Sequence, residues 1–343
     1  MAKGNRTMLA TWHWHIEISS KCTLRCPRCA RQEVPDTLVN TELSLEFFER
    51  NFPREFVLAN VEKITFCGDD GDPIYAHDLI AVIQYFKHIK PVEFVIITNG
   101  SHKKPSWWAE LGQVLTDIDS VHFSVDGYDN YSNNLYRVNS DFDSIIAGIQ
   151  TLRATSLCNI VWAAIAFKFN EHKLDYMQDL ATQLGVDSFQ LTKSTKFGSI
   201  YNSYGTDDEL EPSRDLISST HRFEREVANL TERSSWQTIP FTNLKLYNKS
   251  INAAPIKPLC AIGNKGLYID AKGRLFPCCW VANRYSHNNE WQTLAQQFDL
   301  NTRTVQEVLS DEFWSGEFQT FRWQECQTKC ASTVVTEKYA TEW

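Results

Sequence analysis

Three cysteines stand within eight positions near the start of the chain, and their spacing indicates metal chemistry. They are Cys22, Cys26 and Cys29, in the segment SSKCTLRCPRCAR. Thiolates at positions i, i+4 and i+7 of one short loop can wrap one corner of an iron–sulfur cluster. Three ligands on a four-iron cluster leave one iron open, and an open metal position is where chemistry occurs. The alternative is a zinc site that takes His13 or His15 as its fourth ligand.

The composition argues against a membrane protein, a nucleic-acid-binding protein and a disulfide-rich protein. The chain has 343 residues, of which 43% are hydrophobic, enough to bury a sizeable core in one or two domains. No apolar run reaches the roughly 18 residues of a membrane span, and no signal peptide is evident, so we expect a cytoplasmic protein. The net charge of −8, without a dense Lys/Arg run, argues against a nucleic-acid substrate. Ten cysteines are too few for a disulfide scaffold.

Apolar strand-like runs alternate with helix-like segments over the first two-thirds of the chain. Strands are expected at 12–19, 63–68, 93–100, 120–127, 159–169 and 188–194. Helices are expected at 43–52, 77–90, 105–115, 141–154 and 171–185. This alternation predicts an α/β fold with a parallel sheet. Chemistry in such folds lies on loops at the carboxyl ends of the strands, and the three-cysteine loop directly follows the first strand.

The Cys-x3-Cys-x2-Cys pattern in this position resembles the radical S-adenosylmethionine (radical SAM) superfamily. The resemblance implies a partial, TIM-like (β/α)6 barrel in which Cys22, Cys26 and Cys29 bind a 4Fe-4S cluster. The open iron then chelates the amino and carboxylate groups of the SAM methionine. One-electron reduction splits SAM into a 5′-deoxyadenosyl radical, which abstracts hydrogen from a substrate carbon. A one-electron donor such as flavodoxin or ferredoxin is the implied partner.

The loop after the second expected strand supports the resemblance. Its residues Asp70, Gly71, Asp72 and Pro73 look like the family's Gly-Gly-Glu-Pro loop, which receives the methionine ammonium. The resemblance therefore assigns Asp70, Gly71 and Asp72 to SAM binding. Without the family, Gly and Pro make a tight turn there and the Asp residues are solvated.

Two more SAM contacts are implied by the segment after the fourth expected strand. FSVDG, residues 123–127, is similar to the family segment whose Ser contacts SAM, which points to Ser124 and Asp126. Arg137 is a partner for the SAM carboxylate, a bidentate task suited to guanidinium; the alternative is a surface arginine. Arg28 departs from the family, which commonly has an aromatic residue before the third cysteine. Arg28 could stack on adenine or reach an anionic substrate.

A second set of cysteines resembles the SPASM extension, or its shorter relative twitch, that holds auxiliary clusters. Two fully ligated clusters need about eight thiolates, and this region has five, so one auxiliary 4Fe-4S cluster is expected. The implied ligands are Cys260, Cys278, Cys326 and Cys330. Cys279 is the spare, although it could exchange roles with Cys278. YIDAKGRLFPCC predicts a β-hairpin with a Lys-Gly turn. The alternative is a zinc knuckle.

The expected domains follow from these segments. They are an N-terminal tail at 1–11, the radical SAM partial barrel at 12–200, a bridging segment at 201–257 and the auxiliary-cluster domain at 258–343. Weak candidates for catalysis are Glu17, Lys193 and Asp270, each of which also has a structural interpretation.

The expected function is hydrogen abstraction with a redox outcome on a small polar molecule. A peptide-modifying radical SAM maturase is the alternative. A further alternative is a protein of another class without catalytic activity. In such a protein, zinc or iron–sulfur centres would serve binding or electron transfer.

Overall fold

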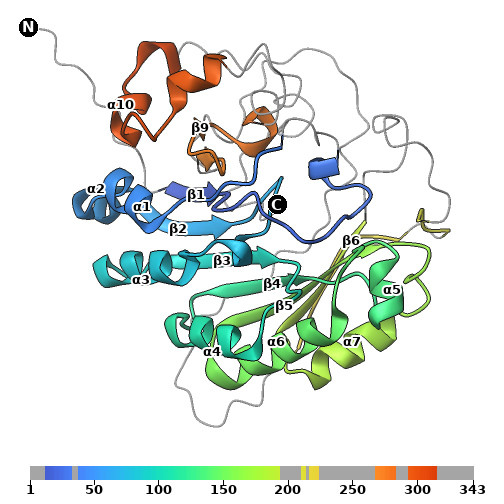
Figure 1. Cartoon of the computed structure of the whole chain (residues 1–343). Helices are drawn as coiled ribbons and strands as arrows, with labels where there is room; N and C mark the ends of the chain where they lie inside the picture. The colour runs from blue at the N-terminus through green and yellow to red at the C-terminus, as the bar shows by residue number, and fades with distance from the viewer. Residues whose placement is uncertain are drawn as a thin grey trace, which may run out of the picture. The chain divides into compact units, whose positions relative to one another are not determined.

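The structure is a computed structural model of the chain, and it describes residues 12–32, 38–193, 210–213, 216–223, 267–282 and 293–314 (Figure 1). The chain divides into two compact units. Unit 1 comprises residues 1–22, 29–98 and 255–343, and unit 2 comprises residues 23–28 and 99–254. The division at residue 98 falls inside the expected barrel, and the domain boundaries drawn from the sequence stay predictions.

Unit 1 is built on a mostly parallel sheet. Its described strands are β1 (Trp12–Ile16), β2 (Val61–Phe66), β3 (Glu93–Thr98), β8 (Tyr268–Ile269) and β9 (Leu275–Phe276). Their order is β3-β2-β1-β8-β9. Only the β8–β9 pair among them is antiparallel. Parallel neighbours need long crossover connections, which the intervening helices supply.

The helices of unit 1 pack on these strands through aromatic side chains. They are α1 (Leu45–Asn51), α2 (Arg54–Asn60), α3 (Leu79–Ile89) and α10 (Val305–Leu309), with the 3-10 turns η1 (Ala30–Gln32), η2 (Pro73–Tyr75) and η6 (Gln296–Phe298). Trp14 of β1 lies edge-on to Phe52, with ring centroids 5.0 Å apart. Phe86 of α3 contacts Phe48 and Phe94 in the same way. All five side chains are fully buried, so apolar burial fixes these helices on the sheet.

The predicted hairpin is confirmed. β8 and β9 pair antiparallel, with Tyr268 opposite Phe276, and Lys272-Gly273 forms the turn. Gly273 has φ +81°, a conformation that favours glycine. Because β8 also pairs with β1, the hairpin extends the sheet of unit 1 on the side of β1.

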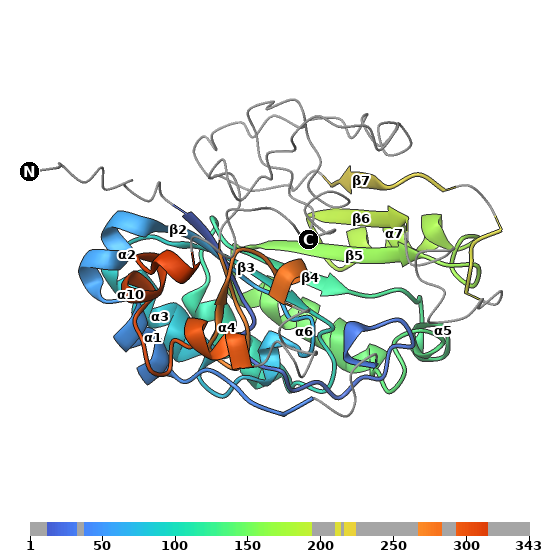
Figure 2. The same ribbon diagram turned by 90° about the horizontal axis from the view of Figure 1, so that it is seen from above.

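Unit 2 also has an α/β architecture. Its described strands are β4 (Ser120–Ser124), β5 (Asn159–Ala166), β6 (Ser188–Lys193) and β7 (Ser219–Arg222). β4, β5 and β6 are parallel, and β7 is antiparallel to β6. The helices are α4 (Pro105–Val114), α5 (Asn130–Asn134), α6 (Phe142–Thr155) and α7 (Leu174–Gln183). Figures 1 and 2 show α4, α6 and α7 along one side of this sheet.

The pattern of apolar residues predicted most of these elements. All six expected strands form, each ending one to three residues earlier than expected. The sequence pattern missed α2, which Pro53 separates from α1, and the short helix α5. It also missed β7, whose four residues are all exposed, because pairing with β6 rather than apolar burial makes that strand.

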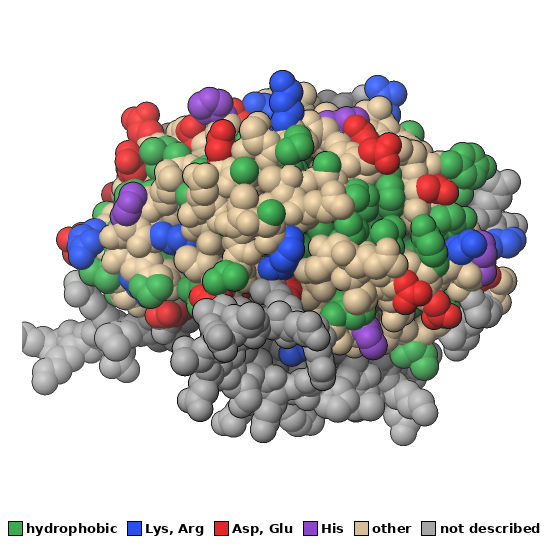
Figure 3. Space-filling view, turned by 90° about the horizontal axis from the view of Figure 1, so that it is seen from below, with side chains coloured by type: hydrophobic (Ala, Val, Ile, Leu, Met, Phe, Trp, Pro, Cys, Tyr) green, Lys and Arg blue, Asp and Glu red, His purple; other side chains and the backbone are tan. Residues whose placement is uncertain are grey.

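The surface shows charges of both signs. On the face drawn in Figure 3, Lys and Arg side chains are interspersed with Asp and Glu. No helix in the described part of the chain is long and apolar enough to cross a membrane.

Candidate functional site

The turn after β2 lies against the backbone that follows β1. The amides of Asp70 and Gly71 donate to Oε1 of Glu17 at 2.7 and 2.9 Å, and the Asp72 amide donates to the Lys21 carbonyl at 2.9 Å. A Cβ atom on Gly71 would overlap the Ser19 carbonyl oxygen. The turn therefore needs glycine at this position, because its backbone passes too close to the segment after β1 for a side chain.

Glu17 is the anchor of this turn. Its side chain is buried, and its Oε2 accepts a hydrogen bond from the Tyr268 hydroxyl at 2.9 Å. Burial, together with the nearby Asp70 and Asp69 carboxylates, raises the pKa of Glu17 well above its usual value. The Asp70 amide and the Tyr268 hydroxyl act in the opposite direction. This carboxyl group thus joins β1, the turn and β8.

Asp72 holds the other end of the turn. Its Oδ1 accepts from the Thr98 hydroxyl at 2.7 Å and from the Ile74 amide at 3.2 Å, which caps η2. Asp70, Gly71 and Asp72, which the resemblance assigns to SAM, therefore share one ordered turn. The described contacts of Asp72 make it a structural acceptor within this turn.

The last cysteine of the loop is held at the same turn. The Cys29 sulfur lies 3.9 Å from the Asp69 carbonyl oxygen. Arg31, two residues later, donates from Nη1 to the Ser20 carbonyl at 2.5 Å and to the Asp70 carbonyl at 2.7 Å. A single guanidinium thus fixes the end of the cysteine loop to the turn after β2.

The middle of the cysteine loop belongs to unit 2, where it docks on the segment after α5. The Arg25 amide donates to the Val138 carbonyl at 3.0 Å, and Asn139 Nδ2 donates to the Thr23 carbonyl at 2.8 Å. Cys26 is buried in this arrangement. In this arrangement the Cys26 sulfur lies close enough to Arg137 to raise the pKa of that guanidinium.

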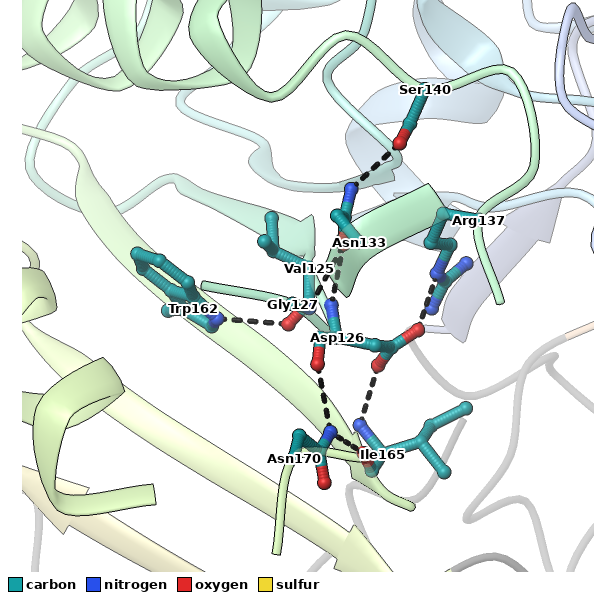
Figure 4. A network of polar contacts seen from close by, with 9 residues as sticks. All are labelled: Val125, Asp126, Gly127, Asn133, Arg137, Ser140, Trp162, Ile165 and Asn170. Carbon is teal, nitrogen blue, oxygen red and sulfur yellow. Dashed lines mark hydrogen bonds and ion pairs between the residues drawn. The ribbon is translucent and has the colours of Figure 1, made fainter. Parts of the chain in front are cut away.

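Arg137 is oriented by a buried carboxylate (Figure 4). Its Nε donates to Oδ2 of Asp126 at 2.6 Å. Burial alone would lower the pKa of Arg137, but Asp126 and then Cys26 raise it above its usual value, so the guanidinium stays charged. A guanidinium has two further nitrogens beyond the one used here, which suits it to an anionic ligand beside Cys26.

Asp126 is itself fixed from several sides (Figure 4). Its Oδ1 accepts from the Ile165 amide at 2.7 Å, and its carbonyl accepts from Asn170 Nδ2 at 2.7 Å. Asn133 Oδ1 accepts from the amides of Asp126 and Gly127, both at 3.0 Å. Asp126 is therefore a positioning residue for Arg137. Neither Asn133 nor Asn170 carried a motif signal in the sequence.

The remaining predicted site residues lie as follows. Ser124 ends β4 and is half-buried, whereas Arg28 is buried. Lys193 ends β6 and is exposed. Asp270 is buried, and its Oδ2 accepts from Arg274 Nε at 2.8 Å.

Two cysteines of the second set, Cys278 and Cys279, lie within the described residues. Cys278 is half-buried and Cys279 is buried at the start of a helical turn over residues 279–282. Cys260, Cys326 and Cys330 lie outside the described residues.

The donor set of the cysteine loop fits an iron–sulfur cluster. Within the described residues Cys22, Cys26 and Cys29 form no disulfide, and thiolates are the usual protein ligands of such clusters. Among the described residues, no group of three or more His, Cys, Asp or Glu side chains is arranged to hold a single metal ion. Each thiolate of a 4Fe-4S cluster binds a different iron, so cluster ligands need not converge on one point.

The residues of this site lie in a segment that matches a known family model. Residues 16–180 match the family model described as the radical SAM superfamily. The matched segment covers just under half of the chain. It contains the cysteine loop, the turn after β2, Ser124 and Arg137.

Solved structures share the fold over most of the chain. Streptococcus suis SuiB bound to S-adenosylmethionine is 13% identical, with a TM-score of 0.58, over 92% of this chain and 69% of SuiB. SuiB bound to its precursor peptide SuiA is 15% identical, with a TM-score of 0.58, over 92% and 68%. Histidine-tagged anSMEcpe with bound AdoMet is 12% identical, with a TM-score of 0.53, over 90% and 79%. A search of the curated proteins gives no match.

At these identities the likeness concerns the fold alone. It confirms the predicted α/β fold, a partial barrel with largely parallel strands. The SPASM or twitch character of the C-terminal segment stays a prediction.

Proposed function

We propose that the chain is a radical SAM enzyme that abstracts hydrogen from a substrate carbon. The observation that carries the proposal is the Cys-x3-Cys-x2-Cys loop after β1, inside the matched residues 16–180. In unit 1, Cys29 contacts the turn that resembles the ammonium-binding loop. In unit 2, Cys26 is among the groups that raise the pKa of Arg137.

The roles of the residues follow from their chemistry. Cys22, Cys26 and Cys29 would hold a 4Fe-4S cluster that, with bound SAM, supplies the reductive cleavage and the radical. Arg137, oriented by Asp126, would bind the SAM carboxylate, and the turn at Asp70–Asp72 would receive its ammonium. Ser124 at the end of β4 is a further SAM contact in this proposal. The electron would come from a flavodoxin or ferredoxin.

The substrate proposed first is a small polar molecule, with an auxiliary 4Fe-4S cluster that accepts or passes an electron. A peptide substrate is the second candidate. It is favoured by SuiB, which shares the fold and whose structure holds a precursor peptide. Incubation of the reconstituted enzyme with pools of each class, followed by mass spectrometry for loss of two hydrogens, separates the two.

The test of the central proposal is iron content and SAM cleavage after anaerobic reconstitution. The wild type is compared with the variant Cys22→Ala/Cys26→Ala/Cys29→Ala. We expect about eight irons per chain to fall to about four, and reductant-dependent 5′-deoxyadenosine to disappear. The matched control is Cys158→Ala, a buried cysteine of unit 2 outside the loop, which should keep both properties.

Two results would overturn this proposal. Zinc in place of iron would indicate a binding protein with a structural zinc site. Intact clusters that never cleave SAM, whatever the reductant, would leave an electron carrier.

A further inference from the structure

We propose that Glu17 is a positioning residue that ties the C-terminal hairpin to the SAM-binding turn, so that docking of the hairpin sets the affinity for SAM. We call Glu17 and its bonds to the Asp70 amide, the Gly71 amide and the Tyr268 hydroxyl the Glu17 brace. The inference rests on the proposed function only in its last step, the identity of SAM as the ligand of the turn.

The turn depends on Glu17 for its shape. One carboxylate oxygen receives two consecutive backbone amides, at 2.7 and 2.9 Å. Consecutive amides that point to one acceptor hold a compact turn, and removal of a buried acceptor leaves both donors unsatisfied. Gly71 permits this approach, because its backbone lies directly against Ser19 and Ser20.

The second oxygen of Glu17 joins the hairpin. The Tyr268 hydroxyl donates to it at 2.9 Å, and the Tyr268 side chain is almost completely buried. Backbone bonds hold the same contact in register: the amides of His15 and Glu17 donate to the carbonyls of Leu267 and Ile269 at 2.9 and 2.8 Å. The His15 ring also lies edge-on to Tyr268, with centroids 4.8 Å apart.

This arrangement connects distant parts of the sequence, since Glu17 and Tyr268 are 251 residues apart and the Asp70 amide bonds to the same carboxyl group. A change in the hairpin is therefore transmitted to the turn through one side chain with three hydrogen-bond partners. A small pocket lies in the same place, and Glu17, Asp70 and Lys272 help to line it.

The experiment uses the reconstituted full chain in its oxidised state, so that SAM binds without turnover. The variants are Glu17→Ala, Glu17→Gln and Tyr268→Phe, with Tyr85→Phe as the control. Tyr85 also belongs to unit 1 and donates its hydroxyl to a backbone carbonyl, that of Phe52, at 2.7 Å. Two quantities are measured: amide hydrogen exchange of a peptide covering residues 68–72 without SAM, and the Kd of radiolabelled SAM by equilibrium dialysis.

We expect Glu17→Ala to speed exchange at residues 70 and 71 and to raise the Kd for SAM by about tenfold. Tyr268→Phe should do the same to a smaller extent, about threefold in Kd. Glu17→Gln keeps an oxygen that accepts both amides, so it should stay within about threefold of the wild type. Tyr85→Phe should leave both quantities unchanged.

Unchanged exchange and Kd in Glu17→Ala and Tyr268→Phe, at wild-type iron content, would overturn the inference. If Glu17→Ala does not load iron, Tyr268→Phe against Tyr85→Phe decides the question. A wild type that binds no SAM while exchange responds as expected would defeat the proposed function and leave the brace itself standing.

Discussion

At the scale of single residues, the site consists of charged groups that are held rather than exposed. Arg137 is fixed by Asp126, and Arg31 is fixed by two carbonyl groups. Glu17 is also fixed by its partners, but burial and two neighbouring carboxylates raise its pKa and so favour its neutral form. Charged groups with fixed partners need little reorganisation when a ligand arrives, which favours binding.

The pKa of Glu17 gives a prediction for stability against pH. The folded chain keeps the Glu17 proton to a higher pH than the unfolded chain does. Above the ordinary carboxyl pKa, the unfolded state binds fewer protons, so this group lowers stability as pH rises until its folded pKa is passed. Each unit of difference corresponds to about 1.4 kcal/mol. Glu17→Gln removes the effect, so its melting temperature relative to the wild type should increase from pH 5 to pH 8.

Differential scanning fluorimetry of the metal-free chain over this range makes the comparison. The exposed Glu49→Gln serves as the control and should track the wild type. If the melting temperatures of Glu17→Gln and the wild type changed in parallel with pH, Glu17 would have the same pKa in the folded and the unfolded chain, and the prediction would be wrong.

At the scale of elements, the hairpin β8–β9 depends on a buried ion pair. Oδ2 of Asp270 accepts from Nε and Nη2 of Arg274 at 2.8 and 2.5 Å, and its Oδ1 accepts from the amides of Lys272 and Arg274. The sequence offered Asp270 as a weak catalytic candidate beside a hairpin-turn role. These contacts support the turn role, because every one of these bonds serves the turn that contains Gly273.

Asp270→Ala should therefore destabilise the fold by about 3–5 kcal/mol, since it leaves the Arg274 charge buried without its carboxylate. Asp270→Asn keeps an acceptor for the two amides and should cost less. Urea unfolding measures both, with Glu62→Ala as the control. Glu62 pairs with Lys90 on the surface, and its loss should cost less than about 1 kcal/mol.

Activity distinguishes the two roles of Asp270. If Asp270 only supports the turn, Asp270→Asn should turn over whatever substrate the wild type accepts in proportion to its folded fraction. A stable Asp270→Asn protein without turnover, but with normal SAM cleavage, would restore the catalytic role.

At the scale of the whole molecule, the C-terminal segment is joined to the first strand. β8 extends the sheet beside β1, so the described residues 267–282, which include Cys278 and Cys279, belong to the unit that holds Cys22 and Cys29. The proposed auxiliary cluster needs thiolates from distant parts of that segment, and three of its four ligands lie outside the described residues.

The auxiliary cluster is tested by replacing Cys260, Cys278, Cys326 and Cys330 together with Ala. We expect about four irons per chain to be lost while the Kd for SAM changes by less than about threefold, because the first cluster keeps its own ligands. Cys279→Ala is the control and should keep all the iron. Loss of iron in Cys279→Ala instead would exchange the roles of Cys278 and Cys279.

The sequence by itself determined the local features of this protein. Continuous apolar runs predicted the six strands, because strands of a parallel sheet are buried on both faces. The spacing of Cys22, Cys26 and Cys29 indicated a cluster, since neighbours in sequence must be neighbours in space. The Lys-Gly turn of the hairpin was readable for the same local reason.

Only the tertiary structure decided which distant groups meet. Tyr268 reaches Glu17 because β8 pairs with β1, and no local pattern encodes the pairing of strands about 250 residues apart. Arg137 acquires its partner because Asn133, Ile165 and Asn170 fix Asp126 from three segments. Buried polar groups must find partners wherever the chain brings them, so such bonds are consequences of packing rather than of spacing in the sequence.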